Sequence, residues 1–379
     1  MAAVPDRPAV TVVLPVRNEA ACIGRALAAV LGQDYPKDRL QILVVDGMST
    51  DGTREIVEDL VRGQAGPLSF VSGLPSSVPG PRSLVLRLLE NPDRIAPCAL
   101  NIGIRAARGD IVIRVDGHCE IASDYVRRCV EHIAKDGVDG VGGSVDTVGE
   151  TRTAEAIAAA MSSRFGVGDS AFRTEQGKTG LVDTVPFPAY TRSVISRAGG
   201  YDEELVRCQD DEYNYRLREL GAKILLAGDI RSRYYSRASL RSLWKQYFQY
   251  GFWKVRVMQK HPKQMRLRQF VPPSFVLSSF IVLGLSFLVG LCGPCRTVRW
   301  GWIPLALVWG SYVAANLGAS VLTASKKGWK HLALLPAVYA ILHLSYGLGF
   351  LAGLFKFWHR WRDKKGRVPE FKPREAEGR

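Results

Sequence analysis

Three long apolar runs in the C-terminal part of the chain constrain its fold more than any other feature. They cover about residues 274–291, 302–322 and 332–355, and each is near the length that crosses a bilayer as a helix. Tryptophans flank these runs, as aromatic residues do at membrane interfaces, at Trp300, Trp302, Trp329, Trp358 and Trp361. The earlier residues are mixed in composition, so we expect a soluble domain (residues 1–235) followed by a transmembrane region of about three spans (residues 269–357).

Basic residues crowd the boundary between these two parts. The formal net charge is +15, and residues 231–268 hold eleven Lys and Arg and no acidic residue. Basic stretches bind nucleic acid in some proteins and anionic lipid headgroups in others. Because this stretch borders an apolar region, we expect a membrane surface and no nucleic acid as its partner.

Residues 239–260 alternate aromatic and basic side chains, a pattern typical of a helix in a membrane interface. We therefore expect an amphipathic interfacial helix and basic linker over residues 236–268. Packing of this helix on the soluble domain is the alternative, and different faces can serve both roles. Trp253 is a candidate for stacking on a sugar ring, although packing is the commoner role of such a residue.

The orientation in the membrane is less simple. Seven scattered cysteines, an odd number, and no signal peptide at the N-terminus favour a reducing cytosol for the first 260 residues. Three crossings would then place the basic tail, residues 358–379, outside the cell, against the tendency of basic segments to stay inside. Either that tendency is broken here, or one apolar run is re-entrant or interfacial.

Short apolar runs alternate with helical patterns in the soluble part. The predicted strands cover residues 10–14, 41–45, 68–71, 84–89, 111–115 and 223–227, and the predicted helices cover residues 19–31, 53–62, 97–107, 123–135 and 211–219. Strands that alternate with helices predict an α/β domain with a mostly parallel, doubly wound sheet.

Asp116 and His118 follow the predicted strand at residues 111–115. Ligands of open α/β sheets bind just outside the carboxyl ends of the strands. Two residues at this spacing on an extended chain point the same way, so a carboxylate and an imidazole can share one divalent cation. An isolated Asp-x-His is weak evidence, but its place at the end of a buried strand strengthens the prediction.

Two other segments, like Asp116 and His118, lie at the carboxyl end of a predicted strand. The stretch from Leu14 to Glu19 leaves a strand and opens a helix, where amides and polar side chains can hold a nucleoside. A helix cap at Asn18 is the alternative interpretation. Asp46 ends the second strand, so its carboxylate can accept a hydrogen bond from a base edge or a ribose hydroxyl.

A row of polar and acidic residues, from Gln209 to Glu212, precedes another predicted helix. Such a row is consistent with a carboxylate base that takes a proton from an acceptor hydroxyl. Acidic residues favoured by the helix dipole are the alternative.

Together these segments resemble family 2 glycosyltransferases with the GT-A fold, and above all the membrane-attached type that builds bacterial exopolysaccharides, such as the succinoglycan glucosyltransferases. The likeness covers roughly residues 8–260 and depends on the order and spacing of four motifs. It implies that the nucleotide-sugar is bound by Pro15, Asn18, Glu19, Asp46, Asn101 and Asp116. It further implies Mn²⁺ or Mg²⁺ on Asp116 and His118, and Asp210 as the catalytic base, with Asp211 as the alternative.

The chain departs from the family pattern at three places. His118 replaces the second Asp of the metal motif, and imidazole binds Mn²⁺ more readily than Mg²⁺. Gln209 replaces the Glu beside the base. The Gln-x-x-Arg-Trp motif of processive members corresponds to Gln246-Tyr-Phe-Gln249-Tyr250, without the Arg and Trp. Gln246 and Tyr250 stay candidates for acceptor or interface contact, and transfer of a single sugar is favoured over polymerisation.

The resemblance implies an inverting, metal-dependent hexosyltransferase of exopolysaccharide biosynthesis. Its donor would be a nucleoside-diphosphate-sugar, foremost a UDP-sugar, and its acceptor a lipid-linked saccharide or a polysaccharide. It would be a multi-pass protein of the inner (plasma) membrane with a cytoplasmic catalytic domain. The alternative is a non-catalytic membrane scaffold of the same fold that binds a polysaccharide or a partner protein.

Overall fold

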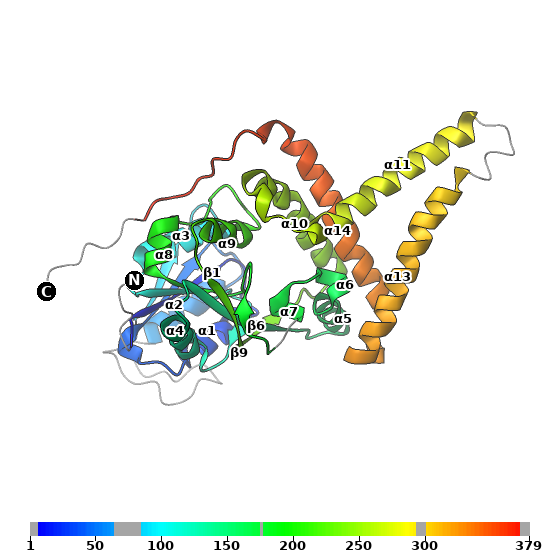
Figure 1. Ribbon diagram of the computed structural model, residues 1–379. Helices are drawn as coiled ribbons and strands as arrows, with labels where there is room; N and C mark the ends of the chain where they lie inside the picture. The colour runs from blue at the N-terminus through cyan, green and yellow to red at the C-terminus, as the bar shows by residue number, and fades with distance from the viewer. Residues whose placement is uncertain (1–6, 64–84, 175–176, 293–300, 372–379) are drawn as a thin grey trace. The chain divides into compact units, whose positions relative to one another are not determined.

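The computed structural model describes residues 7–63, 85–174, 177–292 and 301–371 (Figure 1). The predicted strand at residues 68–71 lies outside them. The chain forms two compact units. The sheet unit comprises residues 1–146, 171–235 and 365–379, and the helical unit comprises residues 147–170 and 236–364.

Nine strands in the described residues form one sheet, in the order β3-β2-β1-β4-β8-β6-β9-β5, with β7 paired to β9. Their bounds are β1 Val10–Val16, β2 Leu40–Asp46, β3 Val85–Glu90, β4 Ile111–Arg114, β5 Cys119–Ile121, β6 Gly140–Val148, β7 Gly180–Leu181, β8 Ala189–Thr191 and β9 Ile224–Tyr235. All seven residues of β2 are buried, because helices cover both faces of the sheet there.

The sheet is mixed, whereas the sequence predicts a mostly parallel one. β3, β2, β1 and β4 are parallel, but β8 runs antiparallel to β4 and to β6, and β5 and β7 run antiparallel to β9. β8 has only three residues and therefore leaves no clear pattern. In β9 the exposed Arg231 and Arg233 alternate with buried residues, so the first two basic residues of the stretch 231–268 lie in the sheet.

Helices cover the two faces of the sheet. Those of the sheet unit are α1 Ile23–Leu31, α2 Thr53–Gly63, α3 Ala96–Ala106, α4 Tyr125–Asp136, α7 Ala171–Thr174, α8 Arg192–Ala198 and α9 Gln209–Glu219. Figure 1 shows α3, α8 and α9 on one face and α1 and α4 on the other. Residues such as Leu100 of α3, Val194 of α8 and Tyr213 of α9 share one buried apolar cluster with Val13 and Leu43 of the sheet.

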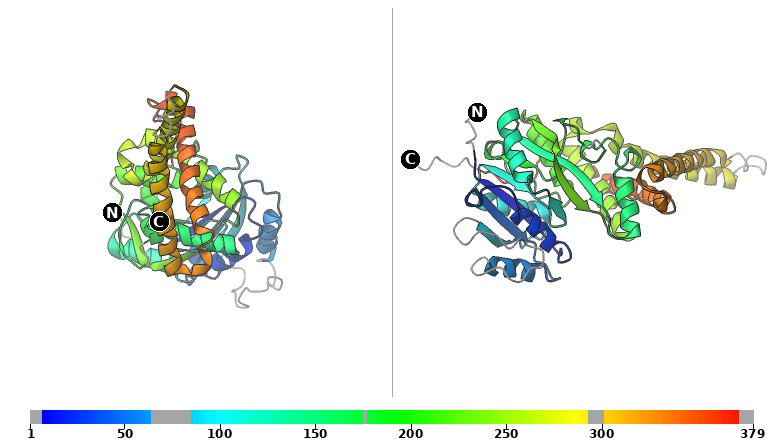
Figure 2. Two further views of the ribbon diagram at one scale, coloured as in Figure 1. Left: turned by 90° about the vertical axis from the view of Figure 1, so that its right-hand side faces the viewer. Right: turned by 90° about the horizontal axis from the view of Figure 1, so that it is seen from below.

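The helical unit contains the three predicted apolar helices. Its helices are α5 Arg152–Met161, α6 Arg164–Val167, α10 Leu240–Lys260, α11 Val271–Cys292, α13 Ile303–Lys327 and α14 Leu335–Lys356. By length and composition, α11, α13 and α14 can each cross a membrane. α11 and α13 contact each other and form a hairpin that overlaps when seen from below (right view of Figure 2), and Figure 1 shows the two helices diverging from their common end. A hydrogen bond of 2.6 Å joins the Ser286 hydroxyl to the Gly301 carbonyl near that end.

Candidate active site

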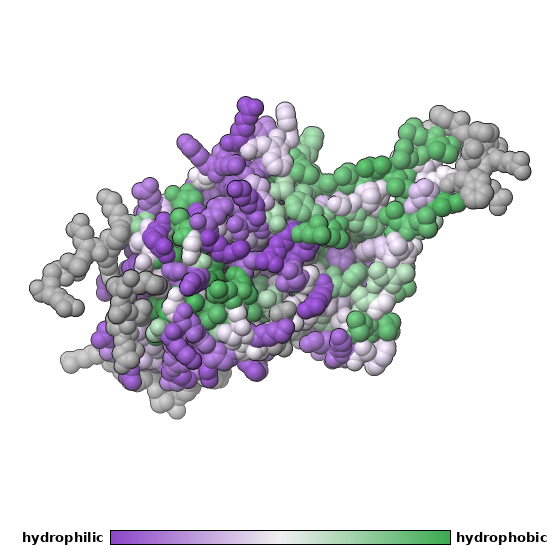
Figure 3. Space-filling view, in the orientation of Figure 1, coloured by the Kyte–Doolittle hydropathy of each residue, from purple (hydrophilic) through white to green (hydrophobic). Residues whose placement is uncertain are grey.

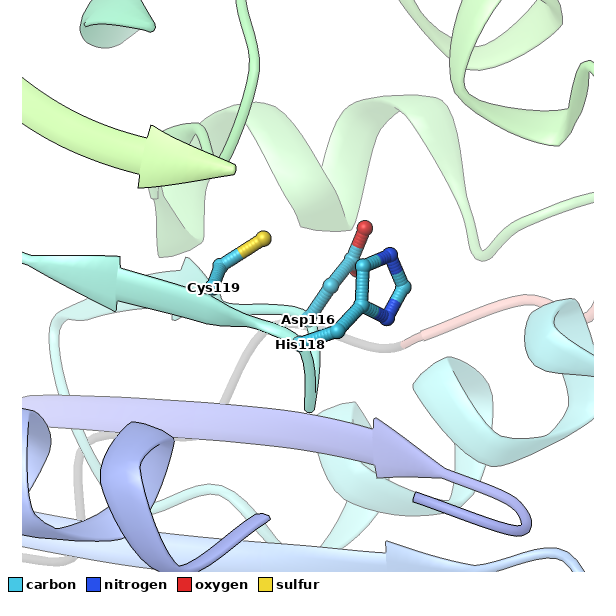
Figure 4. Close-up of side chains that lie close together, drawn as sticks. All are labelled: Asp116, His118 and Cys119. Atoms are coloured by element: carbon cyan, nitrogen blue, oxygen red, sulfur yellow. The ribbon is translucent and has the colours of Figure 1, made fainter. Parts of the chain in front are cut away.

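The carboxyl ends of three parallel strands meet at one edge of the sheet unit. The register pairs Val16 at the end of β1 with Asp46 at the end of β2, and β4 lies on the other side of β1. Asp116 and His118 follow β4 in the connection to β5, and Figure 4 shows their side chains next to each other. The predicted polar residues of three separate segments therefore gather at this edge.

Arg114, the last residue of β4, joins Asp116 to Asp210. Its Nε and Nη2 atoms donate to the two carboxylate oxygens of Asp116 at 2.9 and 3.1 Å. Its Nη1 atom lies 3.8 Å from Oδ2 of Asp210 at the start of α9. Burial acts to raise the pKa of Asp116, but the charge of Arg114 outweighs it and leaves this pKa below its usual range. Asp116 is therefore an anion that is already oriented by its partner.

The sequence reasoning missed Arg114. An arginine two residues before an aspartate on a strand points to the same side as that aspartate, and this spacing was the available signal. The guanidinium is mostly buried, with 13% of the side chain exposed. A bidentate pair of this kind fixes the plane of the carboxylate as well as its charge.

Glu19 orients His118. The distance between Glu19 Oε1 and His118 Nδ1 is 2.9 Å, which leaves Nε2 of the ring available to a cation. Metal-binding histidines commonly donate their other ring nitrogen to a carboxylate in this way. Glu19, which the family resemblance places at the nucleotide, thus contacts the predicted metal ligand directly.

The residues at this edge fit a divalent metal ion. Ligand atoms of Asp116, His118 and Cys119 all lie within 4.8 Å of one another. The Asp116 carboxylate and the His118 imidazole are donors that suit Mn²⁺. They stay the predicted ligands, and the Cys119 thiol lies beside them.

The loop after β2 connects the other predicted nucleotide residues. The Asn18 amide nitrogen donates to the Ser49 hydroxyl at 2.9 Å, and the Asn18 side-chain oxygen accepts from the Thr50 amide at 2.9 Å. Asp46 is fully buried and accepts from both the amide and the hydroxyl of Ser49. Asn18 has a positive φ of 54°, so the turn that follows Pro15 is held against this loop in a defined shape.

Asn101 has a different environment from the other predicted nucleotide residues. Its side chain is 1% exposed. It donates to the Tyr201 carbonyl at 2.8 Å and to Glu203 at 2.9 Å, and it accepts from the Tyr201 amide at 2.7 Å. These contacts use its hydrogen-bonding groups, and the geometry favours a role in holding the loop before α9 over nucleotide contact.

The first turn of α9 holds the two predicted base residues. The Asp210 side chain is 47% exposed, and its Oδ1 accepts from the Asp211 amide at 3.0 Å. Gln209, which precedes it, is 5% exposed, and its side-chain oxygen has no hydrogen-bond partner among the described residues. Asp210 is the member of this row that the Arg114 ion pair connects to the end of β4.

The three predicted acceptor or interface residues lie on α10 in the helical unit. The Gln246 side chain donates to the Tyr250 hydroxyl at 3.0 Å. The Trp253 ring lies 5.6 Å from the ring of Phe252 and 5.7 Å from that of Phe357. Trp253 therefore takes part in packing, the commoner of the two roles considered for it.

Known structures and sequences define the class of this fold. A mannosyltransferase from Pyrobaculum calidifontis, solved in complex with GDP-Man and Mn²⁺, matches with a TM-score of 0.54 and 21% identity, over 93% of this chain and 89% of that one. The chain has a GT-A type glycosyltransferase fold. The Glycosyl transferase family 2 model matches residues 11–198.

Two curated relatives extend the comparison. The succinoglycan biosynthesis protein ExoA of Rhizobium meliloti (strain 1021) is 31% identical over 358 residues, which are 92% of this chain and 96% of that protein. A dolichyl N-acetyl-alpha-D-glucosaminyl phosphate 3-beta-D-2,3-diacetamido-2,3-dideoxy-beta-D-glucuronosyltransferase of Methanococcus voltae is 27% identical over 66% of this chain and 74% of that protein. The chain belongs to glycosyltransferase family 2, and its function lies in polysaccharide or glycolipid biosynthesis.

Proposed function

We propose that this glycosyltransferase is an inverting, metal-dependent hexosyltransferase of exopolysaccharide biosynthesis. Its donor is a nucleoside-diphosphate-sugar, with a UDP-sugar as the first to test, and its acceptor is a lipid-linked saccharide or a polysaccharide. The ion-pair network of Arg114 supports this proposal most directly. It connects Asp116, a metal ligand in the proposal, to Asp210, the proposed proton acceptor, although 93 residues separate them in sequence.

Asp116 and His118 would hold the divalent cation, and Glu19 would orient His118. A bound cation stabilises the negative charge of the departing diphosphate as a Lewis acid. Because one ligand is an imidazole, Mn²⁺ is expected to support activity better than Mg²⁺. Pro15, Asn18 and Asp46 belong to the turn and loop that would bind the nucleotide.

The chemistry of the protein side chains centres on Asp210. Its carboxylate takes the proton of an acceptor hydroxyl, and the hydroxyl oxygen then bonds to the anomeric carbon of the donor sugar. The bond from that carbon to the diphosphate oxygen breaks in the same step, so the nucleoside diphosphate leaves and the configuration inverts. Arg114 keeps the charges of Asp116 and Asp210 apart by lying between them. Asp211, whose amide donates to Asp210, is the alternative base.

We also place the chain in the inner (plasma) membrane as a multi-pass protein with the sheet unit in the cytoplasm, where nucleotide-sugars are available. The apolar helices α11, α13 and α14 support membrane attachment. Gln246 and Tyr250 on α10 are the residues we would test for acceptor contact. Attachment would keep the enzyme at the surface that carries a lipid-linked acceptor.

The test uses the detergent-solubilised full chain in a screen of nucleotide-sugars for Mn²⁺-dependent release of nucleoside diphosphate. Asp210→Asn should lower turnover by about 10²–10⁴-fold, the usual contribution of a general base. The thermal shift produced by nucleoside diphosphate with Mn²⁺ should stay unchanged, because Asp210 is not a metal ligand here.

Asp211→Asn is the matched control, since it removes the same charge one residue away and should retain most of the activity. Full activity of Asp210→Asn would refute the assignment of the base. If no nucleotide-sugar stabilises the parent chain in the presence of Mn²⁺, the scaffold alternative is supported instead.

A further inference from the structure

The segment that follows the last apolar helix is part of the sheet unit. The Arg367 amide donates to Asp202 at 2.8 Å, and the Glu203 amide donates to the Arg367 carbonyl at 3.0 Å. Two residues further on, the Pro369 carbonyl accepts from the Gly200 amide at 2.7 Å. We name residues 365–371 the C-terminal strap. Its backbone is hydrogen-bonded to the loop that precedes α9.

Side chains of the C-terminal strap add to these backbone contacts. Phe371 packs against the apolar cluster of the sheet unit, and the Arg105 guanidinium lies 5.4 Å from the centre of its ring. A Cβ atom at Gly200 would lie 2.7 Å from the Phe371 ring, and one at Gly366 would lie 2.2 Å from Asp202. Contacts as close as these leave no gap between the strap and the loop.

The position of the strap limits how often the chain can cross a membrane. The sheet unit contains residues from before and after all three apolar helices. The residues before the three helices and the residues after them must therefore lie on the same side of the bilayer. A chain that leaves one side and returns to it crosses an even number of times, so at least one of the three helices does not cross.

α14 differs from the other two helices in how much of its surface the protein covers. Within the apolar window of each helix, 44% of the residues are buried in α14, against 17% in α11 and 11% in α13. The large apolar side chains exposed on α11 and α13 include Phe280, Leu285, Phe287, Leu307 and Leu317. Figure 3 shows the corresponding hydrophobic surface along this hairpin.

α10, a helix with charged residues, provides the largest share of the cover on α14, and α11, α13, α5 and α6 also contact α14. Two α14 glycines, Gly349 and Gly353, approach α10 so closely that a Cβ atom at either would lie within 2.5 Å of an α10 carbonyl oxygen. α10 also carries Arg256, which is fully buried, and Lys254 and Lys260, which are 5% and 8% exposed. An α14 that spanned the hydrocarbon would carry these charges into it, at a high free-energy cost.

Arg256 also fixes the chain where it leaves α14. Its guanidinium donates to the carbonyls of Asp363 at 3.1 Å and Arg360 at 3.4 Å, and Gln259 donates to the Phe357 carbonyl at 2.8 Å. The end of α14 and the start of the tail are thus held by α10. Because the tail carries basic side chains, which are costly to place in hydrocarbon, the end of α14 lies in water or at the membrane interface.

We propose that the chain crosses the bilayer twice, through the α11–α13 hairpin, and that α14 stays with α10 at the membrane surface from which the hairpin enters. The hydrocarbon of the bilayer is the partner of the hairpin, and that surface carries the sheet unit, the C-terminal strap and the basic tail. The identification of this side as the cytoplasm rests on the proposed function, whereas the number of crossings does not. Two crossings also place the basic tail inside, which removes the conflict that three crossings create.

Cysteine labelling in intact bacterial cells tests the number of crossings. Cys22, which is partly exposed, and Cys292 and Cys295 are first replaced by serine, while the four buried cysteines are kept. New cysteines are then introduced one at a time by Thr297→Cys, between α11 and α13, and by Glu377→Cys in the tail, and the triple-serine parent gives the background. A membrane-impermeant maleimide should label Thr297→Cys in intact cells and Glu377→Cys only after permeabilisation. Labelling of Glu377→Cys in intact cells would overturn the proposal, and labelling of neither in intact cells would show that the hairpin does not reach the outer face.

A second measurement tests the strap without using transferase activity. A chain that ends at Lys364 should melt several degrees below the parent in detergent, and Phe371→Ala should show a smaller shift in the same direction. Removal of residues 372–379 alone is the matched control and should leave the melting temperature unchanged. An unchanged melting temperature after removal of residues 365–379 would remove the basis for an even number of crossings. Failure of the proposed sugar transfer would affect neither measurement.

Discussion

Two buried arginines show how differently the sheet unit and the helical unit use charge. Arg114 is paired with two carboxylates, Asp116 and Asp210, in the site proposed to bind the metal and the nucleotide-sugar. Arg256 donates to the carbonyl oxygens of Arg360 and Asp363 and to the Gln259 side chain, and its Nη2 atom lies 3.7 Å from Oδ2 of Asp363. The first arrangement orients groups for chemistry, and the second ties chain segments together. Substitution of Arg114 should therefore lower the transferase activity, whereas substitution of Arg256 should lower the thermal stability.

The largest effect is expected from Arg114→Met. Loss of the guanidinium leaves Asp116 and Asp210 without their shared partner, and misplacement of a reacting group by 1 Å can cost about 100-fold in rate. We expect a decrease in kcat of at least about 100-fold, together with a higher Mn²⁺ requirement. Steady-state kinetics across a range of Mn²⁺ concentrations measures both.

Arg114→Lys separates positioning from charge, because lysine keeps the charge and loses the bidentate geometry. It should recover only part of the activity. Arg128→Met, which breaks ion pairs with Asp124 and Asp229 at the surface, serves as the control and should keep kcat. Equal activity of Arg114→Met and the parent would remove Arg114 from the site.

The next effect concerns His118, the proposed metal ligand. Glu19→Gln weakens the partner of its Nδ1 atom, and loss of such a partner typically lowers metal affinity by about 10–100-fold. The Mn²⁺ dissociation constant, measured by electron paramagnetic resonance in the presence of nucleoside diphosphate, should rise accordingly. Cys119→Ser should leave it unchanged, since Asp116 and His118 are the proposed ligands. A large loss of affinity in Cys119→Ser would add sulfur to the ligand set.

A third effect should appear only in stability. Arg256→Met removes the donor to the carbonyls of the partly buried Arg360 and Asp363 inside the helical unit, and the loss of a hydrogen bond typically costs about 0.5–1.5 kcal/mol. Thermal unfolding in detergent should shift down, while the affinity for nucleoside diphosphate with Mn²⁺ stays the same. A change in that affinity without a change in melting temperature would contradict the division between the two arginines.

The smallest effect is pH-dependent. Burial acts to lower the pKa of His132, but its contacts with Asp136 and Asp229, at 2.7 and 2.8 Å, outweigh burial and raise this pKa. A raised pKa in the folded state means that the protonated histidine adds stability at low pH, and that this stability is lost as the pH rises through the folded-state value. His132→Gln should therefore lower the melting temperature at pH 6 and change it little at pH 9. An equal shift at both values would show that protonation of His132 does not contribute.

The sequence was sufficient to predict the strands and helices in which apolar residues form a clear run or recur with a clear period. The four strands β1, β2, β3 and β4 and the three apolar helices lie close to their predicted positions. Asp116 and Asp210 were predicted separately, and the structure brings them to one guanidinium. The antiparallel half was predicted only in part. The predicted strand at residues 223–227 overlaps the start of β9, whereas β8 has only three residues and leaves no clear pattern.

Other features depend on contacts that no local pattern records. Nothing near Asn101 in sequence indicates that its amide is used by Tyr201, one hundred residues away. The return of the C-terminal strap to the loop at Gly200 is equally non-local. Such pairings are decided by the tertiary fold, since each partner alone has an ordinary composition.

The C-terminal strap has a consequence for synthesis. Its Phe371 packs against a buried cluster that contains Val13, so the first strand and the last described residue of the chain contact the same core. A ribosome must therefore finish all the apolar helices before the sheet unit can be completed. A nascent enzyme that has not yet been delivered to the membrane would lack its final core residues, and maturation of the active fold would be tied to insertion.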